Sequence, residues 1–277
     1  MKVRTILTLG RVSNLPTVWT NALAGAVLAG AADFRTVVLS GLALTAFYVG
    51  GMWLNDAFDA EIDAAEKTDR PIPRGEASQG TVFAVGFALL ALGVVLSFTL
   101  GALAGLVGIA LAGFVIAYDA LHKTTALSPL LMGATRFFCY LLPAATVGFT
   151  APVVLGALGL LAYIVGLTYA AKQEAYDRIG AAWPLALLAL PVVYAARETA
   201  GLGVLFAVGF AGVVVVALAL LIRRAKGDVP RAVVTMIAGI SLFDAALIAS
   251  AGALPLALVA VAGFVLTLVL QRVVSGT

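Results

Sequence analysis

The chain carries very little charge. Only 11% of its 277 residues are Asp, Glu, Lys or Arg, whereas 62% are hydrophobic and the mean hydropathy is +1.10. A soluble domain usually contains about 25% charged residues. The composition therefore excludes an ordinary soluble protein and predicts a polytopic membrane protein.

Cysteine and histidine are also scarce, with one residue of each, Cys139 and His122. A single cysteine excludes an intramolecular disulfide framework and a cysteine-based zinc site, and one histidine cannot build a histidine-rich metal centre. A clear signal-peptide cleavage site is missing as well. We therefore expect the basic residues 1–11 to lead directly into the first membrane helix.

Long apolar stretches make up most of the chain. They predict helices over residues 13–31, 36–57, 80–98, 102–119, 129–149, 152–171, 183–196, 202–222, 232–250 and 254–271. Most are long enough for the roughly 20 residues that a membrane span needs, and 183–196 is the shortest. We expect an all-α fold, a polytopic bundle of nine to ten transmembrane helices, forming a single domain over residues 1–277.

The basic residues are distributed unequally between the two ends of this predicted bundle. Arg35 and Arg197 fall at one end and Arg136 lies within a helix. The other 14 of the 17 Lys and Arg residues fall at the opposite end: Lys2, Arg4, Arg11, Lys67, Arg70, Arg74, Lys123, Lys172, Arg178, Arg223, Arg224, Lys226, Arg231 and Arg272. By the positive-inside rule, this end faces the cytoplasm. We expect an integral protein of a bacterial-type inner (plasma) membrane, with its polar loops on the cytoplasmic side.

The most informative polar stretch is residues 53–75, WLNDAFDAEIDAAEKTDRPIPRG. On a helix, Asp56, Asp59 and Asp63 fall within an arc of roughly 60°, and Asn55 precedes Asp59 by one turn. Three carboxylates on one stripe repel one another unless a cation lies between them. Mg²⁺ suits such oxygen ligands and commonly shares its coordination shell with substrate phosphates.

Two arginines follow this acidic stripe in a loop that contains two prolines. Arg70 and Arg74 stand close enough along the chain to fold back over a phosphate group bound at the stripe. The alternative is a solvated acidic helix end followed by a stiff loop. The complete spacing, with an apolar helix before it and the RPIPRG loop after it, favours a site for metal and phosphate.

A second polar face follows the predicted helix 152–171. Tyr169, Gln173 and Asp177 are spaced four residues apart and share one helix face, with Glu174 beside Gln173. Considered alone, this segment is equally well explained as an interfacial helix end.

The two segments together resemble the UbiA superfamily of intramembrane prenyltransferases. The first motif of that family, Asn-Asp-x-x-Asp-x-x-x-Asp, is present at residues 55–63, and its Arg-Pro pair matches Arg70 and Pro71. The second, Tyr-Ala-x-x-Asp-x-x-x-Asp, is matched by Tyr169, Ala170 and Asp177, but Gln173 replaces the first Asp.

Further matches to the family are a Tyr–Lys loop element at Tyr118 and Lys123, and an Arg-x-x-Asn element at Arg11 and Asn14. Three features make the chain similar to the EboC-like branch of this superfamily: the Gln-Glu second motif, the RVSNLPTVWTN opening and the predicted tenth helix.

This resemblance implies a Mg²⁺-dependent enzyme that ionises an allylic prenyl diphosphate and transfers the prenyl group to an acceptor. The implied catalytic residues are Asp56, Asp59 and Asp177. The implied metal ligands are Asn55, Asp56, Asp59, Asp63, Glu174 and Asp177. The implied substrate-binding residues are Asn14, Arg70, Arg74, Tyr118, Lys123, Tyr169, Lys172 and Gln173.

The acceptor stays open at this point, and an aromatic ring, a cyclitol or a lipid are all possible. We expect a prenyl diphosphate donor and membrane lipids as further partners, and no nucleic acid. Because Gln173 removes one charge from the second motif, a transporter or scaffold that keeps the fold without full catalysis is the alternative function. Gln173 either weakens a metal site or hydrogen-bonds a hydroxylated acceptor.

Asp244 is an ionisable residue expected deep in the membrane. It lies about 12 residues into the predicted helix 232–250, roughly 18 Å from its start. Charges at this depth are rare and mark functional sites by default. Arg136 could reach towards Asp244, which leaves two interpretations, a structural ion pair or a site that binds the acceptor.

Overall fold

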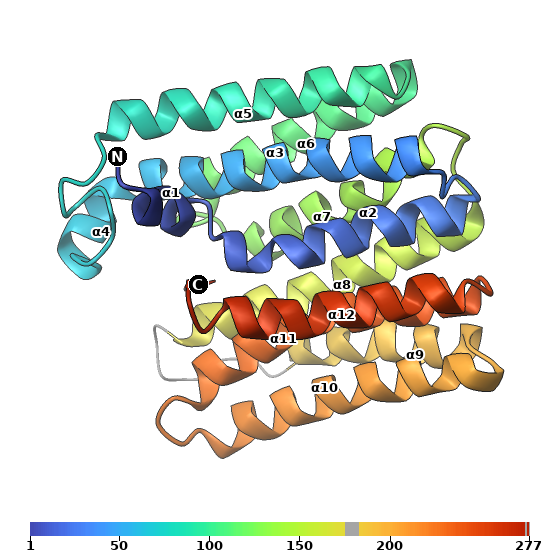
Figure 1. Ribbon diagram of the computed structural model, residues 1–277. Coiled ribbons are helices and arrows are strands. Elements are labelled where there is room, and N and C mark those ends of the chain that lie inside the picture. Colours follow the sequence, from blue (N-terminus) through green and yellow to red (C-terminus); the bar gives the residue numbers. More distant parts are fainter. Residues whose placement is uncertain (175–182, 275, 277) are drawn as a thin grey trace.

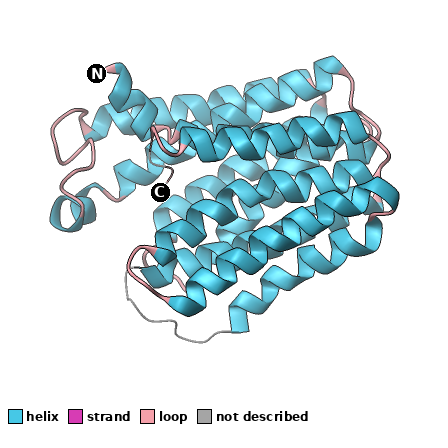
Figure 2. Cartoon of the chain, turned by 60° about the horizontal axis from the view of Figure 1, so that its bottom comes forward, coloured by secondary structure: helices cyan, strands magenta, loops and turns pink. Residues whose placement is uncertain are grey.

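The computed structural model describes residues 1–174, 183–274 and 276. Within these residues every regular element is a helix, as Figure 1 and Figure 2 show. The elements in chain order are α1 (Val3–Leu9), η1 (Val12–Asn14), α2 (Leu15–Ala29), α3 (Phe34–Phe58), α4 (Ala60–Glu66), α5 (Gln79–Thr99), α6 (Ala102–Leu121), α7 (Ser128–Ala144), α8 (Ala151–Glu174), η2 (Trp183–Leu188), α9 (Ala189–Glu198), η3 (Gly201–Gly203), α10 (Val204–Arg223), α11 (Asp228–Ser250) and α12 (Leu254–Leu270).

The all-α prediction is confirmed, but the predicted number of membrane spans is not. Six helical segments in the described residues are long and apolar enough to cross a membrane: Phe34–Phe58, Gln79–Thr99, Ala102–Leu121, Ala151–Lys172, Gly201–Arg223 and Asp228–Ser250. The other predicted stretches form shorter elements. Helix α7 ends at Ala144, directly after Pro143, and 183–196 divides into a 3₁₀ turn and the 10-residue helix α9.

The acidic stripe lies on a helical path that is interrupted only at Asp59. Helix α3 ends at Phe58 and α4 begins at Ala60. The Asp59 N–H still donates to the Asn55 carbonyl (3.0 Å), and its carbonyl accepts from the Asp63 N–H (2.8 Å). The predicted helical spacing of the three carboxylates is therefore nearly preserved. Figure 1 shows α4 at the same end of the bundle as the two chain termini.

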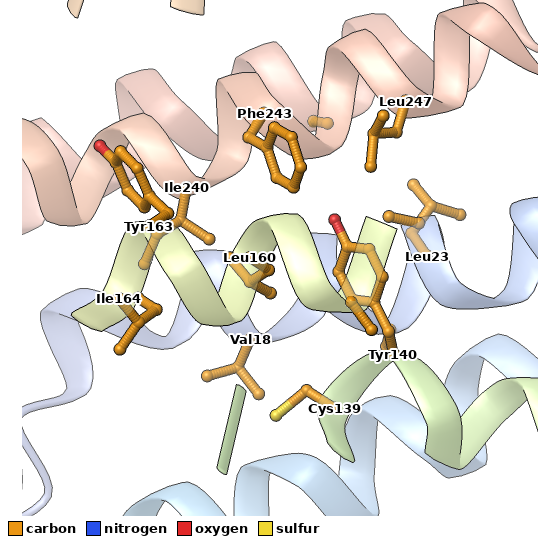
Figure 3. Packing of buried hydrophobic residues seen from close by; sticks show 14 of the residues in the cluster. Val18, Leu23, Cys139, Tyr140, Leu160, Tyr163, Ile164, Ile240, Phe243 and Leu247 are labelled. Atoms are coloured by element: carbon orange, nitrogen blue, oxygen red, sulfur yellow. The ribbon is translucent and has the colours of Figure 1, made fainter. Parts of the chain in front are cut away.

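Helix α11 occupies the centre of the C-terminal half and is buried along most of its length. It packs against α2, α8, α10 and α12, and in Figure 3 its Phe243 and Leu247 lie above Leu160 of α8 and Leu23 of α2. Helices α5 and α10 lie at the outside, where they expose apolar side chains such as Val95 (61%) and Val208 (62%). Such surfaces are those of a protein surrounded by lipid.

Small residues allow the closest helix contacts, as is common between membrane helices. At Gly25 of α2, an added Cβ would stand 2.5 Å from the Tyr140 carbonyl oxygen and 2.9 Å from Pro143 Cγ of α7.

We expect Gly25→Ala to lower the melting temperature of the detergent-solubilised protein by several degrees, because overpacking costs about 1–3 kcal/mol. Gly113→Ala is the matched control, since a Cβ there meets nothing within 4 Å. Equal melting temperatures for the two variants would contradict this packing.

Candidate active site

A cavity of about 620 Å³ lies between the helices and has two chemically different parts. One part is polar and includes Arg11, Asp59, Arg70, His122 and Lys123. The other is apolar and is formed by residues of α2, α3, α6, α7, α8 and α11, among them Val18, Leu44, Phe47, Val115, Ile164 and Ile240. Cavities of about 300–1,000 Å³ hold small ligands in other proteins.

Asp56 lies behind the polar part of the cavity wall, where two arginines that line the cavity bind it. It is only 3% exposed. Its Oδ1 accepts from Arg70 Nη1 at 2.6 Å and from Arg11 Nη2 at 3.1 Å, and Arg11 also donates to Asn55 Oδ1 at 3.3 Å. The first acidic motif is therefore brought together with the RPIPRG loop, as the sequence predicts for Arg70.

Arg11 reaches Asp56 from a strained backbone position. Its φ of 40° and ψ of 47° place it in the left-handed region, between α1 and η1. A residue other than glycine is held there only when its surroundings compensate the strain, and such positions concentrate at functional sites. Tyr48 Oη contributes by donating to the Arg11 carbonyl at 3.2 Å.

Asp59 is paired with cationic and imidazole groups from the loop after α6. Its Oδ2 lies 3.2 Å from His122 Nε2 and 3.4 Å from Lys123 Nζ. Burial alone would raise the pKa of Asp59, but its contacts with His122 and Lys123 outweigh burial and hold the pKa below its ordinary value. Asp59 is thus kept ionised at the cavity wall. His122 was not predicted as a site residue, because nothing local in the sequence links it to Asp59.

Two further carboxylates have buried oxygen atoms without a hydrogen-bond partner, Asp63 Oδ1 and Asp119 Oδ2. Burial raises the pKa of Asp63, and the charge of nearby Arg70 opposes this shift. Asp119 is 3% exposed, lines the cavity and accepts from Asn55 Nδ2 at 3.3 Å. Sequence reasoning missed Asp119, although it directly follows Tyr118 of the Tyr–Lys element.

The structure places most of the other predicted substrate-binding residues near this polar part. Tyr118 lines the cavity and stacks on His122 at a centroid distance of 5.0 Å. Lys172 also lines it, donating to the His122 carbonyl at 2.9 Å and to Ser128 Oγ. Asn14 is buried, with hydrogen bonds to Gly276 (2.9 Å) and Gln271 (2.8 Å).

Some predicted residues lie elsewhere or are not placed. Among the predicted site residues that the structure describes, Asp56, Asp63, Arg74 and Tyr169 are not part of the cavity wall. Arg74 pairs with Glu76 at 3.3 Å and its side chain is 59% exposed. Asp177 lies outside the described residues, and the side chains of Gln173 and Glu174 are likewise not described.

The oxygen-rich donor set suits Mg²⁺, and the unpartnered oxygens of Asp63 and Asp119 leave coordination capacity there. In the described residues, however, no three Asp, Glu, His or Cys side chains converge closely enough to hold a metal. The carboxylates of Asp56 and Asp59 are neutralised by basic groups instead. The residues fit the ion by their chemistry, and Mg²⁺ dependence stays a prediction.

Fold and site together define an α-helical membrane protein whose cavity joins a carboxylate- and cation-rich end to an apolar interior. The chain belongs to the UbiA prenyltransferase family, which matches residues 16–248. This confirms the resemblance drawn from the two motifs.

Individual relatives are similar to different extents. A digeranylgeranylglyceryl phosphate synthase of Methanopyrus kandleri is 30% identical over 212 residues, which cover 76% of each chain. A synthase of the same name from Ignicoccus hospitalis is 38% identical over 104 residues, so this match spans 38% of the present chain and about a third (34%) of the relative. The structure of a UbiA homologue from Archaeoglobus fulgidus bound to GPP and Mg²⁺ superposes with a TM-score of 0.63 at 13% identity, over 88% of this chain and 99% of that one. This last similarity concerns the fold alone.

Proposed function

We propose that the protein is an intramembrane prenyltransferase that moves a prenyl group from an allylic prenyl diphosphate to a lipid acceptor. One observation carries the proposal: a single cavity joins a polar end, lined by Asp59 and by basic residues such as Arg70 and Lys123, to an apolar interior. A prenyl diphosphate has the same two-part chemistry, an anionic head and an apolar tail. Family membership and the GPP-bound homologue support the same donor class.

The basic residues at the polar end bind the diphosphate. Arg70 offers a planar guanidinium fork, which suits phosphate oxygens, and Lys123 offers a mobile point charge. Both now contact carboxylates, at 2.6 Å for Arg70 and 3.4 Å for Lys123. Binding of an anion at this end therefore requires Arg70 and Lys123 either to exchange their carboxylate partners for phosphate oxygens or to contact both at once.

The apolar walls hold the prenyl chain and exclude water from it. Val18, Phe47, Val115 and Ile164 come from four different helices, so the lining is formed by the packed bundle rather than by one loop. A dry environment protects an allylic cation from attack by water.

Mg²⁺ would be held by Asn55, Asp56 and Asp59, with Asp63 in support, and when bound it supplies positive charge where the leaving diphosphate becomes more negative. Glu174 and Asp177 are proposed for a second ion on the strength of the family motif alone. Gln173 lowers the charge of that second set by one.

For the acceptor, we propose a lipid that carries a glyceryl phosphate group. The relatives are named for a product in which two geranylgeranyl groups are joined to glyceryl phosphate. Such an acceptor reaches the cavity from the membrane with its own apolar chain. The positive-inside distribution further supports a polar end that faces the cytoplasm.

The proposal is tested by incubating the purified protein with Mg²⁺, geranylgeranyl diphosphate and geranylgeranylglyceryl phosphate, and analysing the products by mass spectrometry. We expect a product heavier by one geranylgeranyl group, and none when EDTA replaces Mg²⁺. Parallel reactions with an aromatic acid and with a cyclitol test the other acceptor classes. Absence of any prenylated product with all of these acceptors would contradict the proposal and favour a transporter or scaffold.

A further inference from the structure

A buried polar network lies beyond the diphosphate end and has no part in the function described so far. Asp244 of α11 is fully buried, and both of its carboxylate oxygens accept from Asn21 Nδ2 of α2, at 3.1 and 2.9 Å. Tyr140 of α7 donates its hydroxyl to the same carboxylate. Figure 3 shows this hydroxyl pointing from α7 towards α11. Three helices are thus joined by one carboxylate.

Arg136 is the cationic end of this network. Its Nη1 donates to Asn21 Oδ1 at 2.8 Å. The Asn21 amide therefore separates Arg136 from Asp244, and a direct ion pair, one of the two interpretations that the sequence left open, is not formed. Because both Asp244 contacts use the amide nitrogen, the amide oxygen of Asn21 is turned to Arg136. Asp244 therefore lies on the far side of the Asn21 amide and does not contact the Arg136 guanidinium.

The guanidinium of Arg136 is left available to a ligand. Arg136 is half-buried and lines the cavity, whereas Asn21, Tyr140 and Asp244 lie behind the cavity wall. A guanidinium has five N–H donors, and the one hydrogen bond found for Arg136 among the described residues uses only one of them. A cation that lies within the membrane and faces a cavity, with most of its donors unused, has the properties of an anion-binding site.

Arg136 lies deeper in the bundle than the residues of the diphosphate end. It lies eight residues after Ser128, or about 12 Å along α7 from the polar end of that helix. Its Cζ stands 5.7 Å from the centre of the Tyr48 ring, and the Tyr48 hydroxyl donates to the Arg11 carbonyl. Tyr48 therefore spans the distance between Arg136 and Arg11. An anion bound at Arg136 would therefore be a neighbour of the donor diphosphate, with the Tyr48 ring between the two.

We propose that Arg136, held by the Asn21–Asp244 pair, binds the oxyanion of the acceptor, a phosphate in the case of a glyceryl phosphate lipid. The guanidinium fork matches phosphate oxygens in a way that a lysine ammonium does not. This inference rests on the proposed function for its biological meaning, but the anion site itself can be measured without turnover.

The test compares two probes that differ in one group, hexadecyl phosphate and hexadecanol. Their affinities are measured by calorimetry on the whole protein in a maltoside detergent, with saturating inorganic diphosphate present to occupy the polar end. For the wild type we expect hexadecyl phosphate to bind at least about tenfold more tightly than hexadecanol. Arg136→Gln should remove this preference, and Arg136→Lys should retain part of it.

Thr135→Val is the matched control. Thr135 lines the same cavity next to Arg136, and its hydroxyl already donates to the Met132 carbonyl at 2.7 Å. This variant should keep the full preference for the phosphate probe. Equal binding of the two probes by the wild type, or an unchanged preference in Arg136→Gln, would overturn the inference. Should Arg136→Gln not fold, the wild-type comparison and the Arg136→Lys variant still decide.

The same experiment separates this inference from the proposed function. A wild-type protein that prefers the phosphate probe but transfers no prenyl group keeps the anion site and loses the proposed activity. A protein that transfers prenyl groups without this preference keeps the activity, and Arg136 is then a structural residue only.

Discussion

Asp56→Asn is expected to reduce prenyl transfer by at least about 100-fold, because it removes negative charge from the residue that anchors the polar end of the cavity. Asn retains the shape of the side chain, so the loss would reflect charge rather than packing. The measurement is kcat/KM for the prenyl diphosphate, together with the Mg²⁺ concentration that gives half-maximal activity. Asp59→Asn should behave in the same way.

The control for this prediction is Glu61→Gln, an equal loss of charge on the exposed side of α4. It should change kcat/KM by no more than about twofold. Asp56→Asn is also expected to lower the melting temperature, because it leaves Arg11 and Arg70 without a full counter-charge at a site that is 3% exposed. Near-wild-type turnover in a folded Asp56→Asn protein would remove the basis for assigning this site to the reaction.

The second large effect separates the two arginines of the RPIPRG loop. Arg70 lines the cavity and binds Asp56 at 2.6 Å, whereas Arg74 is 59% exposed and pairs with Glu76. We expect Arg70→Gln to lower kcat/KM for the donor by about 100-fold, because a fixed charge on the diphosphate is lost. Arg74→Gln should stay within about twofold of the wild type.

Arg74→Gln is the matched control for Arg70→Gln, since the two positions are four residues apart and both substitutions remove one positive charge. For both variants, kcat and KM should be measured over a range of prenyl diphosphate concentrations. Equal losses in the two variants would mean that Arg74 also meets the substrate, as the sequence resemblance implies. An unaffected Arg70→Gln would exclude this arginine from diphosphate binding.

The fold was largely predictable because its signals are local. Each predicted apolar stretch corresponds to a helix or a 3₁₀–helix pair, and the acidic stripe keeps its helical spacing through Asp59. The ends were less predictable where prolines intervene. Helix α7 stops after Pro143, and Pro184 lies in a 3₁₀ turn where a continuous helix was expected.

The partners of the site residues were harder to predict, because tertiary packing determines them. His122 and Asp59 are 63 positions apart, and Asp119 and Asn55 are 64 apart. Spacing within one segment cannot reveal such pairs. For Arg136 and Asp244 the sequence indicated two buried charges but could not show that the Asn21 amide lies between them. Arg74 fitted the loop pattern, yet the backbone turns it towards Glu76.

Cleavage of a prenyl diphosphate within this cavity is the central step of the proposed reaction, and the amount of diphosphate released per prenylated product tests it most directly. The measurement uses the purified wild-type protein in proteoliposomes, with donor and acceptor lipid, with and without Mg²⁺. We predict one diphosphate released for each prenyl group transferred, and neither product without Mg²⁺. Movement of the intact donor across the bilayer, with no release of diphosphate, would contradict the proposed reaction and identify the protein as a carrier.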